Sequence, residues 1–262
     1  GGRTWTYTPV GDFNGSVALS YEVSDGEFTV PVNTSITVTP VDDPAMIDGD
    51  STGVVTEGAS LVAHGQLTIT DSDTGESSFQ AATIGGQYGT LDIDSGGSWT
   101  YTVYNNLEAV QSLAAGEVLP DSIDVTSYDG TVRTIEITIT GTNDGPVLSG
   151  PAPQATVSED DSTFTFDLLS GVSDVDTTDT LSVDVSSIAP VSGDASGIVI
   201  NTDGTLSVDP NAYTHLPVGT DEIVTFGYLV EDGNGGSVEQ TATITITGAD
   251  DTPIIEGDMS GS

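Results

Sequence analysis

The sequence predicts an all-β protein built from tandem Greek-key β-sandwiches in a linear array. Three observations lead to this fold class: a composition rich in Thr, Ser, Val, Ile and Gly, a strand pattern that recurs along the chain, and Asp-Gly pairs between alternating runs. The 262 residues are enough for two full domains, at about 100–130 residues each.

The clearest repeat is a closing strand followed by an acidic link. Residues 36–44 read ITVTPVDDP, residues 137–146 read ITITGTNDGP, and residues 244–253 read ITITGADDTP. Each copy alternates apolar and polar residues, which is typical of a strand with one buried face. The proline after each link is expected to begin the next domain.

Two further features recur before each closing strand. An aromatic or apolar strand is expected three times, at residues 3–8, 98–102 and 204–208. A penultimate strand that ends in Asp-Gly also appears three times, at residues 21–26, 125–130 and 228–233. Asp-Gly between two alternating runs predicts a hairpin. Trp99 is expected in the core of its sandwich.

These repeats define the expected domain boundaries. Residues 1–43 form the second half of a domain, residues 44–145 and 146–252 form two complete domains, and residues 253–262 begin another. Residues 47–53 (IDGDSTG) return as residues 255–261 (IEGDMSG), so the array alternates two domain types. Residues 106–116 (NLEAVQSLAAG) are the one convincing helical stretch, expected as a short crossover between strands.

The charge balance excludes several classes of partner. The sequence has 41 Asp plus Glu against two basic residues, Arg3 and Arg133, for a net charge of −39. This charge repels nucleic acid and anionic membranes, and no apolar run is long enough for membrane insertion. Cations are the expected companions. Because there are no cysteines to form disulfides, metal ions are expected to stabilise an exported repeat protein of this kind. The alternative is a surface that is acidic only for solubility.

Four motifs run through residues 44–145 in a fixed order: GTL at 89–91, WTY at 99–101, VQSLAAGE at 110–117 and GTNDGP at 141–146. Together they resemble the VCBS repeat of giant RTX-type bacterial surface adhesins, over the whole of this domain. Residues 1–43 and 146–252 carry DFNG at 12–15 and the Asp-Gly hairpins, and they resemble the bacterial cadherin-like repeats that neighbour VCBS repeats.

The resemblance implies immunoglobulin/cadherin-like sandwiches that act as calcium-stiffened spacers outside the cell. It also implies export by a type I system to the bacterial cell surface, a role in cell adhesion or biofilm formation, and no enzymatic activity. The glycine-rich calcium-binding nonapeptides of the RTX export region do not occur here, so this piece is expected upstream of that region.

Calcium prefers about six to eight hard oxygen ligands, which carboxylates on flexible loops supply. In a sandwich of about seven strands, the loop after the second strand and the last hairpin lie where the chain enters. The expected ligands are Asp71, Asp73 and Asp129 with the link Asp42 and Asp43; Asp174, Asp176 and Asp232 with the link Asn143 and Asp144, joined by Glu57; and Glu159 with Asp250 and Asp251. The alternative is plain solvated turns, because Asp-Gly is also a turn signal.

The sequence leaves four functions to consider, which its features support to different degrees. The first is a stiff extender that contacts calcium ions and neighbouring repeats. The second is a glycan-binding module, which the 6% aromatic content disfavours. The third is a filament subunit whose neighbouring chain completes residues 1–43. A hydrolase is least supported, because His64 and His215 lie in different domains and Cys and Lys are absent.

Residues 1–43 carry only the later strands of a sandwich. Alone they would expose an apolar sheet face around Trp5, Tyr7, Leu19 and Tyr21, together with unpaired strand edges. We therefore expect other polypeptide to cover them, either further sequence of the same adhesin or a neighbouring subunit.

Overall fold

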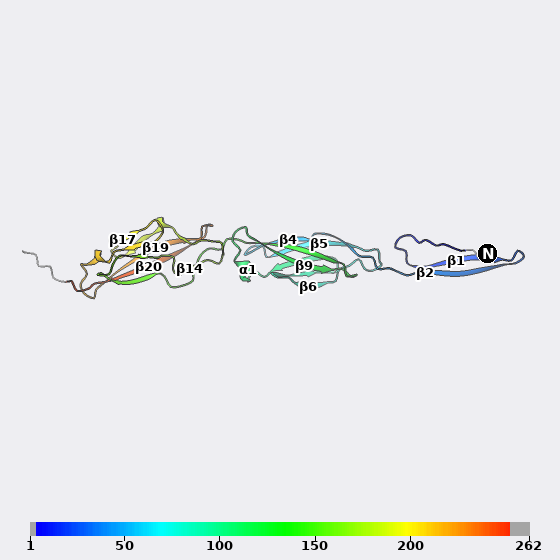
Figure 1. Ribbon diagram of the computed structural model, residues 1–262, viewed down its shortest axis with the longest axis horizontal. Helices are drawn as coiled ribbons and strands as arrows, with labels where there is room; N and C mark the ends of the chain where they lie inside the picture. Colours follow the sequence, from blue (N-terminus) through cyan, green and yellow to red (C-terminus); the bar gives the residue numbers. More distant parts are fainter. Residues whose placement is uncertain (1–3, 252–262) are drawn as a thin grey trace, which may run out of the picture. The chain divides into compact units, whose positions relative to one another are not determined.

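Strands dominate the structure, a computed structural model that describes residues 4–251 (Figure 1). Contacts divide the chain into two compact units. The first contains the residues up to Asn105 together with Leu119–Ile139, and the second contains Asn106–Val118 and the residues from Thr140 onward. Residues 253–262, which are predicted to begin another domain, lie outside the described residues.

The N-terminal hairpin, defined as β1 (Gly15–Ser24) and β2 (Thr29–Val38), is a two-stranded antiparallel sheet coloured blue in Figure 1. Its tip is the predicted Asp-Gly turn, in which Gly26 has a φ of 105° that L side chains rarely adopt. The sheet pairs in register along its whole length, from Ser24 opposite Thr29 outward.

The first sandwich consists of two sheets. One has the order β3-β5-β8-β7-β6, formed by β3 (Met46–Gly49), β5 (Val62–Thr70), β8 (Ser98–Val103), β7 (Gly89–Ile93) and β6 (Ala82–Gly85). The other has the order β4-β10-β9, formed by β4 (Thr52–Thr56), β10 (Val132–Thr140) and β9 (Val118–Thr126). The predicted Asp-Gly turn at residues 129–130 lies between β9 and β10.

The core of the first sandwich confirms the prediction for Trp99. Leu91, Trp99 and Tyr101 are each at most 1% exposed, because alternate residues of a strand point to the same face. The Trp99 indole N–H donates to the carbonyl oxygen of Asp50 at 2.7 Å. A Cβ on Gly65 would lie 2.3 Å from Trp99 Cζ2, so only glycine leaves room for this ring.

The second sandwich has a main sheet of order β12-β20-β19-β15, and β16 also pairs with β19. These strands are β12 (Gln154–Ser158), β20 (Ser237–Thr247), β19 (Asp221–Glu231), β15 (Ser182–Val183) and β16 (Ala189–Ser192). A second sheet has the order β13-β18-β17, formed by β13 (Phe164–Phe166), β18 (Leu206–Val208) and β17 (Ile198–Ile200). A further pair joins β11 (Val147–Leu148) to β14 (Val172–Ser173).

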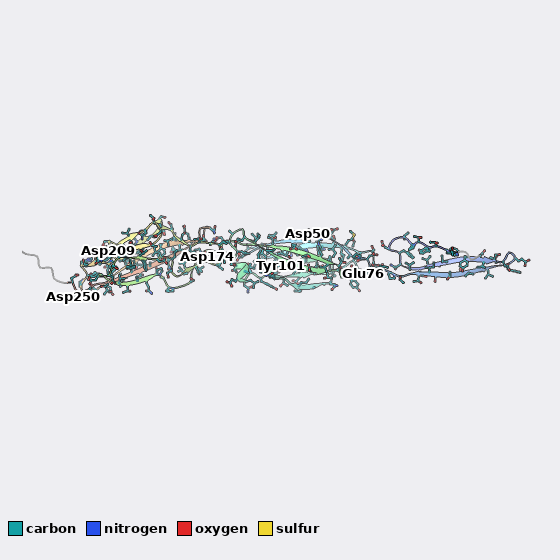
Figure 2. All side chains as sticks on the ribbon, in the orientation of Figure 1. Asp50, Glu76, Tyr101, Asp174, Asp209 and Asp250 are labelled. Atoms are coloured by element: carbon teal, nitrogen blue, oxygen red, sulfur yellow. The ribbon has the colours of Figure 1, made fainter. Side chains whose placement is uncertain are left out.

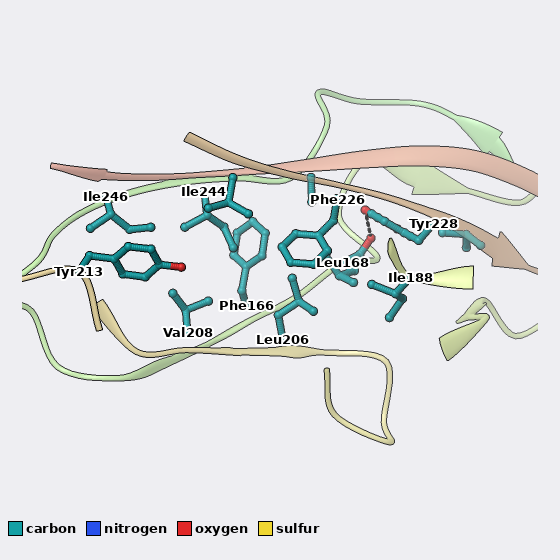
Figure 3. Packing of buried hydrophobic residues seen from close by; sticks show 13 residues of the cluster. Phe166, Leu168, Ile188, Leu206, Val208, Tyr213, Phe226, Tyr228, Ile244 and Ile246 are labelled. Atoms are coloured by element: carbon teal, nitrogen blue, oxygen red, sulfur yellow. Dashed lines mark hydrogen bonds between the residues drawn. The ribbon is translucent and has the colours of Figure 1, made fainter. Parts of the chain in front are cut away.

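The two sheets of the second sandwich enclose one apolar core. Figure 3 shows Leu206 and Val208 of β18 facing Phe226 of β19 and Ile244 of β20. The Tyr228 hydroxyl, also in this core, donates to the carbonyl oxygen of Leu168 at 2.8 Å, which satisfies its polar atom inside an apolar region. The predicted all-β class and its tandem sandwiches are confirmed.

Helical structure is limited to short segments. The helix α1 (Glu108–Gln111) falls inside the predicted stretch 106–116. Two 3₁₀ turns, η1 (Val185–Ser187) and η2 (Pro210–Tyr213), follow Asp184 and Asp209, whose carboxylates accept backbone N–H groups of the turns.

The strand predicted over residues 3–8 is wrong for the part that the structure describes, because residues 4–8 are irregular. In the first sandwich the equivalent strand β8 lies between β5 and β7, and in the second β18 lies between β13 and β17. Residues 4–8 have no such neighbours within the described chain. A strand needs them to pair its backbone N–H and C=O groups.

Candidate metal centres in two acidic loops

The link before the first sandwich is tied to the loop that follows β5. In this loop the backbone N–H of Asp73 donates to Asp71 Oδ1 at 2.8 Å, which closes a tight turn. Asp73 Oδ2 accepts the backbone N–H of Asp43 at 2.9 Å. The structure therefore brings together a link residue and both acids of the predicted Asp-x-Asp motif.

A second carboxylate, Asp129, holds the same link. Its Oδ2 atom accepts the backbone N–H of Ala45 at 2.9 Å and the Thr131 hydroxyl at 2.7 Å, and the Ser127 hydroxyl donates to its other oxygen. These hydrogen bonds, led by that of Ser127, hold the pKa of Asp129 well below its ordinary value. Asp129 is thus an anion at neutral and mildly acidic pH.

Asp42, Asp73 and Glu76 form the first acid group, in which one carboxylate oxygen of each residue lies within 4.8 Å of the others. Figure 2 labels Glu76. Glu76 Oε2 and the neighbouring Asp71 Oδ2 are buried and accept no hydrogen bond. Burial, followed by the charges of Asp42 and Asp73, raises the pKa of Glu76.

Asp43 faces a further carboxylate that the sequence did not predict. Burial, followed by the charge of Asp12, raises the pKa of Asp43. Asp12 has a φ of 61°, the one positive value outside glycine among the described residues. Asp12 belongs to the DFNG motif at residues 12–15. The position of this motif directly before the hairpin β1–β2 could have suggested a role for Asp12 at the link.

The second sandwich repeats this arrangement in the loop after β14. The backbone N–H of Asp176 donates to Asp174 Oδ1 at 3.0 Å, and Asp176 Oδ2 accepts the backbone N–H of the link residue Asp144 at 2.9 Å. Asp174, Asp176 and Asp179 form the second acid group, with one oxygen of each within 4.8 Å of the others; Figure 2 labels Asp174.

Asp176 is the most buried member of either group, at 3% exposed. Its Oδ1 atom accepts no hydrogen bond, and neither do Asp174 Oδ2 and Asp179 Oδ2. Burial raises the pKa of Asp176 against the opposing hydrogen bond from Asp144, and the charges of Asp144, Asp179 and Asp174 raise it further. Three carboxylates thus lie close together where the described residues supply too few hydrogen-bond donors for their oxygens.

Asp232, in the last hairpin, holds the other side of the second link. It is 1% exposed and accepts the Asn143 side-chain amide at 2.9 Å. The backbone N–H groups of Asn234, Gly235 and Gly236 also donate to it. Burial alone would raise the pKa of Asp232, but the donors, led by Asn143, outweigh burial and hold the pKa low. Asn143 Oδ1 itself accepts no hydrogen bond.

Sequence reasoning missed Glu76 and Asp179, although a signal for both exists. The loops read DSDTGE at residues 71–76 and DVDTTD at residues 174–179. Each has an acid at the first, third and sixth positions. The shared third acid distinguishes these loops from a plain Asp-x-Asp turn.

The remaining predicted residues lie apart from these groups or remain to be tested. Glu159 is fully buried, accepts the Ala249 N–H at 2.6 Å, and its Oε2 has no hydrogen-bond partner. Asp250 and Asp251 are exposed. Glu57 is buried in the first compact unit, whereas the second acid group belongs to the second unit, so its part in that group stays a prediction.

The donor set fits a hard divalent cation. Both groups consist of carboxylate oxygens without His or Cys, which favours calcium or magnesium over zinc or copper. Lysine is absent from the sequence, so no ammonium group can balance these charges. The histidines lie outside both groups: His64 Nδ1 is 3.0 Å from Thr100 Oγ1, and the His215 ring stacks on Tyr213.

Two family profiles match different parts of the chain. Residues 42–141 match the profile of a bacterial cadherin-like domain, and residues 1–39 and 142–247 match that of a cadherin-like domain. The chain belongs to the cadherin-like domain family. Cadherin-like domains are typically structural or adhesion modules, and cadherin domains generally bind calcium. A search of curated protein sequences finds no significant match.

Solved structures show the same fold at low identity. Protocadherin gamma B2 extracellular cadherin domains 1–5 superpose with a TM-score of 0.54 at 13% identity, over 92% of this chain and 47% of that chain. Human mucin-like protocadherin EC1-2 gives 0.52 at 16% identity, over 78% and 99%. Mouse protocadherin-24 EC1-3 gives 0.51 at 15% identity, over 91% and 81%. The chain thus spans about half the length of the gamma B2 structure. Among residues 4–251, every helix is too short to cross a bilayer.

Proposed function

We propose that this chain is a calcium-stiffened extender of a bacterial surface adhesin that supports cell adhesion or biofilm formation. The observation that carries the proposal is Asp176. It is 3% exposed, and its Oδ1 atom has no hydrogen-bond partner although the carboxylates of Asp174 and Asp179 lie beside it. A buried carboxylate oxygen without a donor is unfavourable, and a calcium ion supplies the missing partner.

Each acid group also touches the link that enters its sandwich. Asp73 holds the backbone of Asp43, and Asp176 holds the backbone of Asp144, while the same carboxylates offer an oxygen to the group. A cation in the group therefore fixes the link to the loop. Without the cation the like charges of the carboxylates repel one another, and this repulsion weakens the hydrogen bond to the link. Calcium thus stiffens the point at which the chain enters each sandwich.

Several features support an extracellular and bacterial setting. The match of residues 42–141 is to a bacterial cadherin-like domain, and cysteine is absent, which leaves metal ions to do what disulfides do in other exported repeats. The VCBS and RTX resemblance extends this proposal to a giant adhesin whose neighbouring repeats are the partners of this chain. Glu57, Glu159, Asp250 and Asp251 complete the proposed ligand set at the junctions.

Calcium titration of the full chain tests this proposal. We expect saturable binding at both acid groups with Kd on the order of 10⁻⁴–10⁻³ M, as in extracellular calcium modules. At a calcium concentration of 100 times Kd, binding stabilises the folded chain by about 2.7 kcal/mol. Calorimetry and thermal unfolding with calcium, with magnesium and with chelator give the measurement. The same melting temperature and the same scattering profile in calcium and in chelator would refute the proposal.

A further inference from the structure

The last strand of the second sandwich is paired along only part of one edge. β20 pairs with β19 along its whole length, whereas on its other side β12 pairs only with residues 243–247. Among the described residues, no strand pairs with residues 237–242 on that side, and this stretch is called the free edge below. The link touches the beginning of the free edge, where Gly145 lies beside Gly236.

The backbone groups of alternate residues point toward the free edge. Thr243 donates its N–H toward β12, to the carbonyl oxygen of Pro153. Leu229, which lies opposite Glu239, donates its N–H away from β20. Because the direction of these groups alternates along a strand, Glu239 and Thr241 also turn their N–H and C=O groups to the free edge.

A side chain of the strand itself closes part of the free edge. Gln240 Oε1 accepts the N–H of Thr241 at 3.2 Å, in place of a bond between strands. Gln240 is 5% exposed, and its Nε2 atom is buried without a hydrogen-bond partner. Because the same amide group reaches the N–H of Thr241, its Nε2 also lies at this edge. A buried donor without an acceptor is unfavourable, and a carbonyl group of an added strand would satisfy it.

A groove with a volume of about 620 Å³ adjoins the free edge. Its lining includes Gly227 and Leu229 of β19 and Glu239 and Thr241 of β20, which face outward because they alternate with buried residues of the core. Two further lining residues, Leu148 and Val191, are 52% and 68% exposed. A Cβ on Gly227 would lie 3.3 Å from Val191 Cγ2, so the missing side chain deepens the groove beside an apolar wall.

The sequence leaves the free edge without the usual protection against pairing. Exposed edges normally carry lysine, proline or several charges. Residues 240–247 (QTATITIT) contain neither proline nor a charged residue, and lysine is absent from the chain. The edge is therefore suited to receive another strand.

Charge restricts the occupant of the groove. Glu239 is the one acid among the lining residues, and it lies outside both acid groups. A second copy of this chain would bring a net charge of −39 and no lysine, so repulsion opposes it. A foreign segment with a basic side chain is attracted instead. The apolar lining adds a place for a large apolar side chain.

We propose that the free edge and its groove bind an extended peptide of a partner protein, in which basic and large apolar side chains alternate with small residues. The peptide adds a strand to residues 237–242 of β20. Its backbone pairs with Glu239 and Thr241, and one of its carbonyl groups accepts the Gln240 amide. On the outer face the basic side chain meets Glu239, and the apolar side chain crosses Thr241 toward the space at Gly227.

Titration with synthetic peptides tests the proposal. The probe TKTWTKT carries Lys and Trp at alternate positions and reads the same in both strand directions. It is added to the full chain in saturating calcium, and the amide NMR signals of residues 237–242 are followed. We expect saturable shifts there, and binding at least about 10-fold weaker for TETWTET, because its charges repel Glu239.

Two backbone-methylated probes separate strand addition from attraction by charge alone. One carries N-methyl groups on Lys and Trp, and the other carries them on Thr, while the side chains and net charge stay the same. Only one set of N–H groups faces β20, so one methylated probe should bind like TKTWTKT and the other at least about 10-fold more weakly. Equal binding of all three probes would overturn the proposal, and so would the absence of binding by TKTWTKT.

Substitutions in the chain test the same contacts from the other side. Thr241→Pro removes an N–H that is not part of the β19 ladder, so the sandwich should stay folded while TKTWTKT binds about 5-fold more weakly or worse. Thr241→Ser keeps the N–H and is the matched control. Gly227 lacks a positive φ, so Gly227→Val fits the strand. It should fill the groove and weaken TKTWTKT more than the smaller probe TKTATKT.

Thermal unfolding shows that each variant is folded. Unchanged binding by a folded Thr241→Pro chain would overturn the proposal. Shifts of residues 237–242 that grow with protein concentration in the absence of peptide would also overturn it, because a second copy would then be the occupant.

Discussion

The loops at 71–76 and 174–179 have acids at the same spacing, but the two acid groups to which they contribute differ in depth. In the first group Asp42 is exposed and Asp73 and Glu76 are half-buried, whereas in the second group Asp176 is 3% exposed. The hairpin carboxylates follow the same trend, since Asp232 is 1% exposed and Asp129 is half-buried. The depth matters because charges interact more strongly where water is excluded. If a cation fills both groups, as proposed, the shared loop motif should give two sites that depend on it to different degrees.

The links also differ at one equivalent position. The first link has Asp42 where the second has Asn143. Asn143 donates its amide to Asp232 and so neutralises part of the buried charge without a cation. Asp42 instead adds a carboxylate to the first acid group. The second site thus combines deeper burial with fewer charges in its link.

The largest effect should come from removing the deepest ligand. Asp176→Asn should weaken calcium binding at the second group by at least the roughly 10–100-fold that loss of an outer-shell partner costs a metal site. Asp73→Asn should weaken the first group by less, because Asp73 is half-buried and solvent supplies part of the coordination. Titration calorimetry of both variants gives the comparison. Glu239→Gln, an exposed acid of β20, is the control that should leave both affinities unchanged. Equal losses in the two aspartate variants would show that depth does not set the affinity.

An exchange of the two link residues should have the next largest effect. Asn143→Asp removes the amide donor and sets a carboxylate against the buried Asp232, so the calcium-free chain should lose about 1–3 kcal/mol of unfolding free energy. Calcium should recover most of that loss. Denaturant unfolding in chelator and in calcium measures both. The reverse change, Asp42→Asn, should stabilise the calcium-free chain slightly and weaken calcium binding at the first group. A loss for Asn143→Asp that calcium does not reduce would place Asn143 outside the metal site.

The pH dependence of the unfolding free energy should be the smallest effect, and its sign should differ between the calcium-free and the calcium-bound chain. Asp176, Glu76 and Asp43 have raised pKa values, so the calcium-free folded chain binds protons that the unfolded chain does not. Its unfolding free energy should rise as the pH falls from neutral toward the ordinary carboxyl value of about 4. Below that value stability should fall, because Asp129 and Asp232 have lowered pKa values and resist protonation.

In saturating calcium the trend at mildly acidic pH should reverse, since protons then compete with the ion for the same oxygens. Melting temperatures between pH 7 and pH 4, with and without chelator, test this. A calcium-free chain that loses stability steadily over this range would contradict the raised pKa values.

The repeated hairpins could be predicted from the sequence because their cause is local. Asp-Gly between alternating runs requires a turn with a positive φ, and the structure has such a turn at Gly26, Gly130 and Gly233. The hydrogen bonds of Asp73 and Asp176 to the links agree with position in the sequence, since the last hairpin and the loop after the second strand are expected where the chain enters.

The burial of the acids and the strand partners of residues 4–8 could not be predicted from local sequence. The loops at 71–76 and 174–179 have the same pattern of acids, and only the surrounding chain makes Asp176 nearly inaccessible while Asp73 stays half-buried. Residues 4–8 have the composition of a strand, but strand formation depends on partners elsewhere in the fold. Local sequence determines which groups can bind or pair, and long-range packing determines which of them do.

The parallel pairing of β12 with β20 has a mechanical consequence. These strands lie near the beginning and the end of the second sandwich, and they are joined from Gln154 opposite Thr243 to Ser158 opposite Thr247. When a chain is pulled from both ends, such strands are drawn in opposite directions along their length. The hydrogen bonds between them are then loaded together in shear, whereas an antiparallel terminal hairpin would open one bond at a time. The rupture force of this sandwich should therefore depend on that short parallel seam. The N–H of Glu159 donates to the carbonyl oxygen of Thr247, and donors to β20 alternate along β12, so a proline at Val157 should lower the rupture force by removing one of these donors.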